Sequence, residues 1–544
     1  MTIGRNAASV VLCLLVLLAS GASRAQSPSS TDVVVYGGTA AGVMTAYSAS
    51  RQGLHVILLE PGHHLGGMVT GGLSATDLGD AEVIGGYAKL FYRRVAEHYG
   101  RSRLYRASDW LSEPHISEDT FGAMLREAGV KIVFGARLRE HHGVTVADRN
   151  IVSVTSEDGR EWRAKVFADC SYEGDLLAQS GVTYTVGRES AQSYGETLAG
   201  VRTITSQHQF NWPISAYRDG HQLYPEISTG RLEAAGSGDR NVQAYNFRLI
   251  LTDDPANRLP FPKPDGYDPS QFALLARYLQ DFHSHTGREA SLKDVFHPVR
   301  LPNRKADFNN NGPFSSDYIG HSAAYPDAGY QDRQRIRDEH LRYTQGLLYF
   351  LTHDPAVPAT LKGELNAWGL PRDEFADTGH WPRELYVREG RRMVGDYVVT
   401  QADLQTKRTK PDSIGMGSYN SDSHNVERIA MPDGSVRNEG DMQVAVQPYQ
   451  MPYRVMTPRK DEMHNLLVPV CLSASHVAYS SLRMEPQFMI LGEAAGVAAA
   501  LAVQSGVPVQ DIPIARLQGE LLKTGAVLEL PEGGLFGAAG LPPD

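Results

Sequence analysis

Cysteine is scarce in this chain, with 3 among 544 residues, at Cys13, Cys170 and Cys471. No Cys-x-x-Cys pair and no zinc-type spacing of Cys and His occurs, which excludes a dithiol relay and predicts no metal site. Cys170 and Cys471 each follow an apolar, strand-like run, so we expect buried, unreactive thiols. A single disulfide between them stays open as an alternative if the compartment is oxidising.

A surplus of positive charge is also missing, because 52 Lys and Arg face 62 Asp and Glu, a net charge of −10. Without a basic stripe, a nucleic-acid partner is excluded and attraction to an anionic membrane is not expected. Heptads and internal repeats are absent. An apolar share of 42% and a charged share of 21% are typical of a soluble globular protein. The length predicts two or more packed domains.

The N-terminus carries an apolar run, residues 7–19, after Arg5 and before the small-residue segment Ser23-Arg24-Ala25. This order predicts a cleaved signal peptide over residues 1–25, and therefore a secreted or periplasmic protein without membrane attachment. The run is shorter than the ~20 residues of a membrane span, although an uncleaved anchor is the alternative. No twin arginine is present, so we expect Sec-type export with cofactor loading outside.

A glycine-rich turn follows the first buried-strand pattern, Val33–Tyr36, and precedes a small-residue helix over 43–52 and a strand over 55–60. Such a strand–turn–helix–strand unit binds a dinucleotide pyrophosphate at the helix N-terminus. Glu60 lies 18 positions after Gly42, where an acid accepts hydrogen bonds from both ribose hydroxyls and repels a 2′-phosphate. A glycine turn in a cofactor-free fold is the alternative. The predicted pyrophosphate-binding residues are Gly37, Gly38, Thr39, Ala40, Ala41 and Gly42.

The loop after Glu60 favours FAD over NAD. Flavoproteins of the glutathione-reductase type carry a similar Gly-Gly loop under the flavin's pyrophosphate and ribityl chain. A flexible surface loop is the alternative interpretation. The predicted cofactor-binding residues of this loop are Pro61, Gly66, Gly67 and Met68.

The remaining pattern indicates an α/β fold in which a second domain interrupts the first. We predict helices over 86–98 and 118–128, and a small β-meander built from 130–134, 151–154 and 162–167. The second domain should hold helices near 272–283, 333–351 and 358–368, followed by a strand at 465–470 and a helix at 488–504. The predicted parts are an FAD-binding domain over 32–186, a cap or substrate domain over 187–464, a return to the first domain over 465–527 and a loose tail over 528–544.

Motifs along nearly the whole mature chain resemble the FAD-dependent oxidoreductase family of exported bacterial proteins, some of which carry the name xanthan lyase. The most specific are Ser473–Tyr479, Arg483–Pro486 and Leu491–Gly496; Thr39 is the family's own variation, and Gly390 replaces its alanine. Further matching segments are 35–42, 64–68, 172–177, 307–312 and 388–395. The resemblance implies a Rossmann-type, glutathione-reductase-like FAD domain with an interleaved α+β cap domain.

The resemblance also implies further cofactor residues. Asp169, Gly174 and Asp175 would follow the strand that ends near the adenosine. Glu485, Gln487 and Phe488 would start the last long helix, whose positive end stabilises negative charge at the flavin's pyrimidine edge.

Three residues are candidates for chemistry. His476 is the first candidate base, or else a structural histidine bonded to backbone. Arg483 would hold a substrate carboxylate, a sugar hydroxyl or a flavin phosphate, unless it only pairs with Glu485. His115 is a weaker candidate for substrate contact.

Other polar clusters have simpler interpretations. Asp422-Ser423-His424 does not form a triad, because adjacent side chains do not face one another, and a loop that reaches substrate is preferred. Arg391 and Arg392 would pair with acids of the cap domain or bind an anionic substrate. The segment Asp307–Gly312 lacks the acid spacing of a calcium loop, so we expect Asn-rich turns.

These features predict a secreted FAD-dependent oxidoreductase that oxidises a small polar substrate by hydride transfer to flavin N5, and a carbohydrate-derived alcohol is one candidate for that substrate. One alternative is a lyase or isomerase whose FAD is structural or undergoes no net redox change. The other is a carbohydrate-binding protein with a vestigial flavin fold. His63 and His64 lie close enough to the predicted flavin loop to be candidates for a covalent flavin link.

Overall fold

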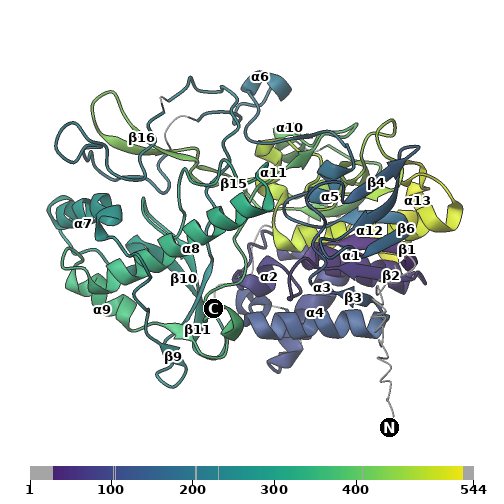
Figure 1. The fold of residues 1–544 in the computed structure, drawn as a ribbon, viewed down its shortest axis with the longest axis horizontal. Coiled ribbons are helices and arrows are strands. Elements are labelled where there is room, and N and C mark those ends of the chain that lie inside the picture. Colours follow the sequence, from purple (N-terminus) through teal and green to yellow (C-terminus); the bar gives the residue numbers. More distant parts are fainter. Residues whose placement is uncertain are drawn as a thin grey trace, which may run out of the picture.

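The computed structural model describes residues 29–530 apart from 102, 105, 203–204, 231 and 407. The predicted signal peptide, and the predicted tail from residue 531, lie outside these residues. The first domain is built on a seven-stranded sheet in the order β3-β2-β1-β6-β5-β4, with β20 added beside β6 (Figure 1). Five of its strands run parallel: β1 (Ser29–Tyr36), β2 (Val56–Leu59), β3 (Lys131–Val133), β6 (Glu161–Asp169) and β20 (Leu466–Leu467).

The predicted β-meander is partly wrong. Strand β3 pairs in parallel with β2 at the sheet edge, and only β4 (Val144–Ala147), β5 (Asn150–Thr155) and β6 run antiparallel to one another. The error has a physical reason, because β3 is partly exposed along its length and so lacks the continuous apolar pattern of a central parallel strand.

Two helices pack closely against the sheet, α1 (Ala40–Arg51) and α12 (Glu485–Ser505). A side chain at Gly492 or Gly496 would lie 2.3 or 2.5 Å from a backbone oxygen of α1, so the two glycines permit this approach. Helix α12 is long and apolar enough to span a membrane, but 83% of its most apolar window is buried inside the fold. We interpret it as a core helix. Further helices of this domain are α3 (Gly86–His98), α4 (Pro114–Ala128), α5 (Asp175–Gln179) and α13 (Ile514–Lys523).

The second domain has its own apolar core, around Phe210, Trp212 and Phe308. It contains a three-stranded sheet, β10 (Phe296–Arg300), β11 (Lys305–Asn310) and β8 (Leu249–Thr252), and the helices α7 (Ala273–Thr286), α8 (Tyr330–His353) and α9 (Ala359–Asn366). Figure 1 shows α8 running from this domain toward the first one.

The Asn-rich turn expected at 307–312 is wrong for its first residues, because Asp307–Asn310 belong to strand β11. The Asp307 carboxylate accepts hydrogen bonds from Arg248 and from the backbone of Ser74 and Ala75, which allows an acid to occupy a buried strand position.

Short elements complete the chain. Hairpin-like pairs are β14 (Ser413–Gly417) with β19 (Tyr449–Pro452), β15 (Ser421–Ser423) with β18 (Met442–Val444), and β16 (Glu427–Ala430) with β17 (Val436–Glu439). Two-residue strands pair as β7 (Tyr184–Thr185) with β13 (Arg392–Met393), and β9 (Arg258–Leu259) with β12 (Leu370–Pro371). The remaining α-helices are α2 (Met68–Gly71), α6 (Ala191–Tyr194), α10 (Gln401–Gln405) and α11 (His476–Leu482).

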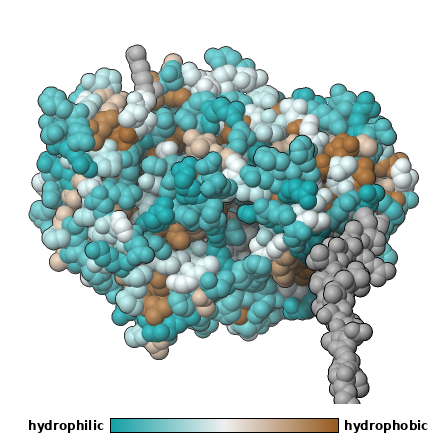
Figure 2. Space-filling model, in the orientation of Figure 1, coloured by the Kyte–Doolittle hydropathy of each residue, from teal (hydrophilic) through white to brown (hydrophobic). Residues whose placement is uncertain are grey.

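The surface is mostly hydrophilic, with scattered apolar residues on the face shown in Figure 2. Cys170 and Cys471 are both buried and unpaired, as predicted.

Candidate functional site

The turn between β1 and α1 has the close packing that a pyrophosphate loop needs. Gly37 adopts φ +92°, a conformation that favours glycine. A Cβ at Gly42 would lie 1.8 Å from the carbonyl oxygen of Gly37, so a side chain there would push the helix away from the turn. Thr39 caps α1, since its hydroxyl accepts a hydrogen bond from the Gly42 N–H at 3.2 Å. Ala40 and Ala41 form the first turn of that helix.

Glu60, at the end of β2, points into this turn. Its two carboxylate oxygens accept hydrogen bonds from the backbone N–H groups of Gly38 at 2.6 Å and Gly62 at 2.5 Å. Burial raises the pKa of Glu60 to about 8. Glu60 therefore lies beside the glycine turn, as its spacing from Gly42 in the sequence predicts.

A cavity of about 380 Å³ opens at this turn, within the range of small-molecule sites. Six of the predicted cofactor residues line it: Gly37, Thr39, Glu60, Pro61, Gly67 and Asp175. Its other walls include Ser171, Tyr172 and Glu173 and, from the second domain, Tyr325, Tyr330, Arg333, Arg337 and Glu384.

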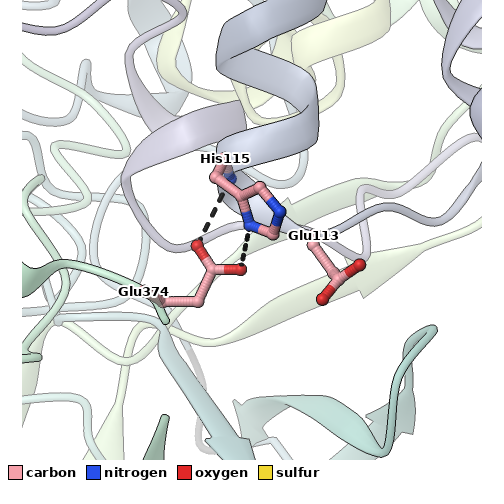
Figure 3. A group of neighbouring side chains, drawn as sticks. All are labelled: Glu113, His115 and Glu374. Atoms are coloured by element: carbon pink, nitrogen blue, oxygen red, sulfur yellow. Dashed lines mark hydrogen bonds and ion pairs between the residues drawn. The ribbon is translucent and has the colours of Figure 1, made fainter. Parts of the chain in front are cut away.

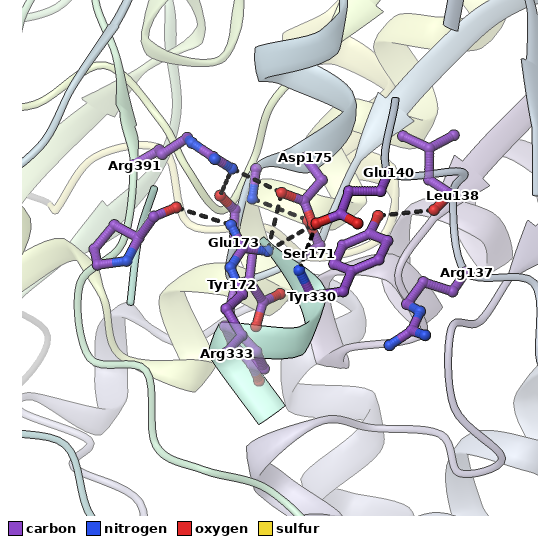
Figure 4. Close-up of polar contacts among 12 residues, drawn as sticks. Arg137, Leu138, Glu140, Ser171, Tyr172, Glu173, Asp175, Tyr330, Arg333 and Arg391 are labelled. Carbon is purple, nitrogen blue, oxygen red and sulfur yellow. Dashed lines mark hydrogen bonds and ion pairs between the residues drawn. The ribbon is translucent and has the colours of Figure 1, made fainter. Parts of the chain in front are cut away.

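Helix α8 closes one side of this cavity (Figure 4). Arg333 binds both carboxylate oxygens of Asp175, at 3.0 and 2.8 Å, and Arg391 donates to the same carboxylate at 2.7 Å. The Tyr330 hydroxyl donates to the carbonyl of Leu138 at 2.8 Å. Asp175 therefore joins the two domains through ion pairs, and these pairs occupy the carboxylate that we predicted for the cofactor.

Other predicted cofactor residues support the cavity without lining it. The Asp169 carboxylate accepts hydrogen bonds from the backbone of Ser171 and Leu177, at 3.1 and 2.8 Å, and holds the turn after β6. Gly174, at φ +68°, precedes α5 in that turn. The Gly66 N–H donates to the carbonyl of Gly38 at 2.7 Å, which attaches the second glycine loop to the first.

Tyr172 connects the cavity to the N-terminus of α12. Its hydroxyl accepts a hydrogen bond from the Met68 N–H at 2.9 Å and donates to Glu485 Oε1 at 2.7 Å. Burial raises the pKa of Glu485 to about 8. Within the described part of the chain, Glu485 Oε2 and Gln487 Oε1 are buried without a hydrogen-bond partner. Phe488 packs near the Tyr172 ring, with 6.4 Å between ring centroids.

His476 and Arg483 are not brought together. His476 is the first residue of helix α11 and Arg483 follows its last residue, seven positions later, which corresponds to about 10 Å along the axis. His476 is buried, and its Nδ1 lies 2.8 Å from the Glu389 carboxylate. Arg483 donates to the Tyr386 hydroxyl at 2.9 Å and to the carbonyl of Asp422 at 2.8 Å. The simple ion pair between Arg483 and Glu485 that we considered is not formed.

His115 lies in a separate cluster, shown in Figure 3. Its Nδ1 is 2.6 Å from Glu374, and Glu113 completes a group with metal-like spacing. The buried ammonium of Lys305 lies 2.5 Å from Glu113 and 2.8 Å from Glu374 and so supplies the positive charge that a cation would bring. We interpret the cluster as structural, and it shares no contact with Arg483.

An aspartate–histidine pair beside Arg483 was missed as a candidate from the sequence. His424 Nδ1 lies 2.7 Å from Asp317, and its Nε2 is 3.9 Å from the Asp422 carboxylate. Arg388 binds the other oxygen of Asp317 at 2.9 Å, and its guanidinium lies 4.7 Å from the centroid of the Tyr386 ring. The partners are up to 107 positions apart, so no local motif indicates them.

A sequence profile described as FAD dependent oxidoreductase matches residues 32–521. The chain belongs to this family. FAD is its cofactor, and the protein is an FAD-dependent oxidoreductase with a Rossmann-type binding domain. The resemblance and the fold class predicted from the sequence are confirmed.

The solved structures that this chain matches are only distantly similar to it. The Diels-Alderase PyrE3 is 11% identical over 52% of this chain and 47% of that chain, with a TM-score of 0.26. The amino acid oxidase NikD is 17% identical over 30% of this chain and 57% of that chain, with a TM-score of 0.21. THI4 from Thermovibrio ammonificans is 17% identical over 31% of this chain and 71% of that chain, with a TM-score of 0.22. This chain therefore spans about half the length of the first two, and likenesses this low carry no argument about activity. No curated protein matches the sequence.

The residues present fit FAD. At the glycine turn the chain is packed so closely that a side chain would collide with backbone, and Glu60 lies at the edge of this turn. At the N-terminus of α12, Glu485 Oε2 and Gln487 Oε1 are buried without a partner among the described residues.

Proposed function

We propose that this protein oxidises a small polar substrate, with carbohydrate-derived alcohols as the favoured class, where the FAD domain meets the second domain. The observation that carries the proposal is a set of buried polar atoms that have no partner among the described residues. Near Arg483 these are Arg483 Nε, Arg388 Nε, Ser421 Oγ, Ser423 Oγ and Asn425 Oδ1. Buried polar groups are rarely left unsatisfied, so a polar ligand is expected there.

Bound FAD supplies the hydride acceptor, so the chain must orient the substrate and take its proton. Arg483 is the proposed orienting residue. His424 is the favoured proton acceptor. The Asp317 carboxylate, 2.7 Å from Nδ1, favours the tautomer that carries its proton there, and burial lowers the pKa of His424 to about 4, which keeps the imidazole neutral at pH 7. His476 has a similar partner in Glu389 and stays as the alternative predicted from the sequence.

An anaerobic reduction assay tests this proposal. Purified holoenzyme would be mixed with neutral sugars, sugar acids and amino acids while the flavin band near ~450 nm is followed. We expect at least one compound to bleach the flavin, and His424→Asn to slow bleaching by about 10²-fold or more while FAD is retained. An unsaturated product without flavin reduction would contradict oxidation and select the lyase alternative. Loss of rate only in His476→Asn would transfer the proton-accepting role to His476.

We also propose that the protein is exported and that residues 1–25 are removed. The order of Arg5, the apolar run and the small residues before Gln26 supports this. The intact mass of protein from the periplasm or medium should correspond to a chain that starts at Gln26. A full-length mass found in the membrane fraction would contradict cleavage.

A further inference from the structure

We infer that the substrate carries a carboxylate and that Arg483 binds it; this rests on the proposed oxidation at the same site. Arg483 is 3% exposed, and no carboxylate of the described residues lies within ion-pair distance of it. The other buried arginines all bind an acid at 2.5–2.9 Å: Arg188, Arg248, Arg333, Arg388, Arg391, Arg392 and Arg428.

The partners of Arg483 are neutral, a phenol and a backbone carbonyl, and its Nε has no partner among the described residues. Burial lowers the pKa of Arg483, but Tyr386 and the carboxylates of Asp422 and Asp77, which lie beyond ion-pair distance, raise it above the ordinary value. The Nε–H donor is left for an anionic ligand to fill. The guanidinium fork matches a carboxylate, whose two oxygens accept parallel hydrogen bonds.

The position of Arg483 favours a substrate over the cofactor's own phosphates. The residues around the glycine-turn cavity do not include Arg483. Its contacts are instead Tyr386 and Asp422 of the second domain, beside the Asp317–His424 pair. A carboxylate on Arg483 would therefore be held close to the proposed proton acceptor.

Two serine hydroxyls near Arg483 indicate that the ligand also carries hydroxyl groups. Ser421 and Ser423 flank Asp422 on strand β15, and their buried hydroxyls have no partner in the part of the chain that is described. Such groups suit a polyhydroxylated acid, such as a sugar acid. Oxidation of such an acid would break a carbinol C–H bond, whose hydride bound FAD would accept, while His424 would take the hydroxyl proton as the C=O bond forms. Dioxygen or a dye then accepts the two electrons.

Matched acids and neutral sugars test the inference on the FAD-loaded protein. The pairs are D-gluconate with D-glucitol, D-glucuronate with D-glucose, and D-galacturonate with D-galactose. Binding is measured as a saturable change in the flavin spectrum, and oxidation as anaerobic bleaching. We expect an acid to bind at least about 10-fold more tightly than its neutral partner, the effect of a charge-assisted hydrogen bond. Arg483→Gln should remove that preference, and Arg483→Lys should restore part of it.

The control is Arg335→Gln on the exposed face of α8, which should keep the wild-type preference. Melting temperature and FAD content show whether Arg483→Gln is folded. Neutral sugars that bleach the flavin as well as acids, with or without Arg483, would overturn the carboxylate inference and leave oxidation standing. Acids that bind in an Arg483-dependent way without bleaching would support the anion site and contradict the proposed oxidation. No Arg483-dependent response to any acid would overturn the inference.

Discussion

At the scale of single residues, Gly42 is the position where one added carbon has the largest expected effect on cofactor binding. A Cβ there would meet the Gly37 carbonyl at 1.8 Å, so Gly42→Ala must displace helix α1 from the pyrophosphate turn. We expect Gly42→Ala to weaken FAD binding by ~1.4 kcal/mol or more, which is about a tenfold or larger rise in Kd, so the variant should retain less FAD than the wild type after dialysis against FAD-free buffer. The ratio of flavin to protein absorbance measures this.

The matched control for that change is Gly363→Ala, in the exposed part of helix α9, where an added Cβ meets nothing within 4 Å. It should keep its FAD and gain about 0.5–1 kcal/mol of stability from the helix preference for alanine. Equal FAD content in both variants would mean that the turn does not bind the pyrophosphate.

The dependence of the flavin-reduction rate on pH below 7 tests His424 as the proton acceptor. The charged or titratable groups around it are Asp317, Arg388, Asp422 and His208, and burial lowers its pKa to about 4, below the ordinary 6.5. The neutral form then persists down to about pH 4, so the rate of flavin reduction should stay level from pH 7 to 5 and fall below that. Stopped-flow bleaching across this range measures it. An inflection near 6.5 would point to an exposed imidazole instead.

The same shift has a consequence for stability. A histidine whose pKa is lower in the folded state favours folding fully above its unfolded pKa, and that contribution is lost as pH falls from 6.5 through about 4. Burial also lowers the pKa values of His321 and His340, so they contribute to stability in the same way.

At the scale of elements, helix α8 covers the dinucleotide site and is held there by the ion pair between Arg333 and Asp175. Arg333→Gln removes one of the two cations on the Asp175 carboxylate and leaves Arg391, so the cost should be below the ~3–5 kcal/mol of a fully unpaired buried charge. We expect Arg333→Gln to speed FAD release by about tenfold or more, seen as the recovery of flavin fluorescence after dilution. Arg335→Gln, two positions away with a side chain that is 57% exposed, should release FAD at the wild-type rate. Equal rates of FAD release in both variants would contradict a role of helix α8 in retaining FAD.

Local sequence pattern predicted the elements that carry their own signal. Helix α3 matches its predicted bounds, Gly86–His98, and the βαβ unit with its glycine turn follows from residues 33–60. Helix α8 was placed by its apolar spacing, although its first turn was missed. Strands β3 and β11 were misjudged because one lies at a sheet edge and the other buries an acid through contacts from distant segments.

The site was less predictable than the fold. The glycine turn and Glu60 lie within one continuous motif, so their roles can be read locally. The Asp317–His424 pair and the contact between Tyr386 and Arg483 join residues 107 and 97 positions apart, which no spacing rule reveals.

At the scale of the whole molecule, the fold does not depend on disulfides. Cys170 and Cys471 are buried and unpaired, and burial raises the pKa of both thiols. We expect the mature protein to resist a thiol reagent when native, to react at both positions after denaturation, and to keep its melting temperature in a reductant. A single reactive thiol pair that appears only after reduction would contradict this account.

The most direct test of the central claim is the absorbance spectrum of the mature protein before and after acid precipitation. The glycine turn, Glu60 and the cavity beside α8 predict bands near ~370 and ~450 nm that pass into the supernatant as FAD. A yellow pellet would instead indicate a covalent flavin and direct attention to His63 and His64. A colourless protein that also fails to take up added FAD would contradict the account.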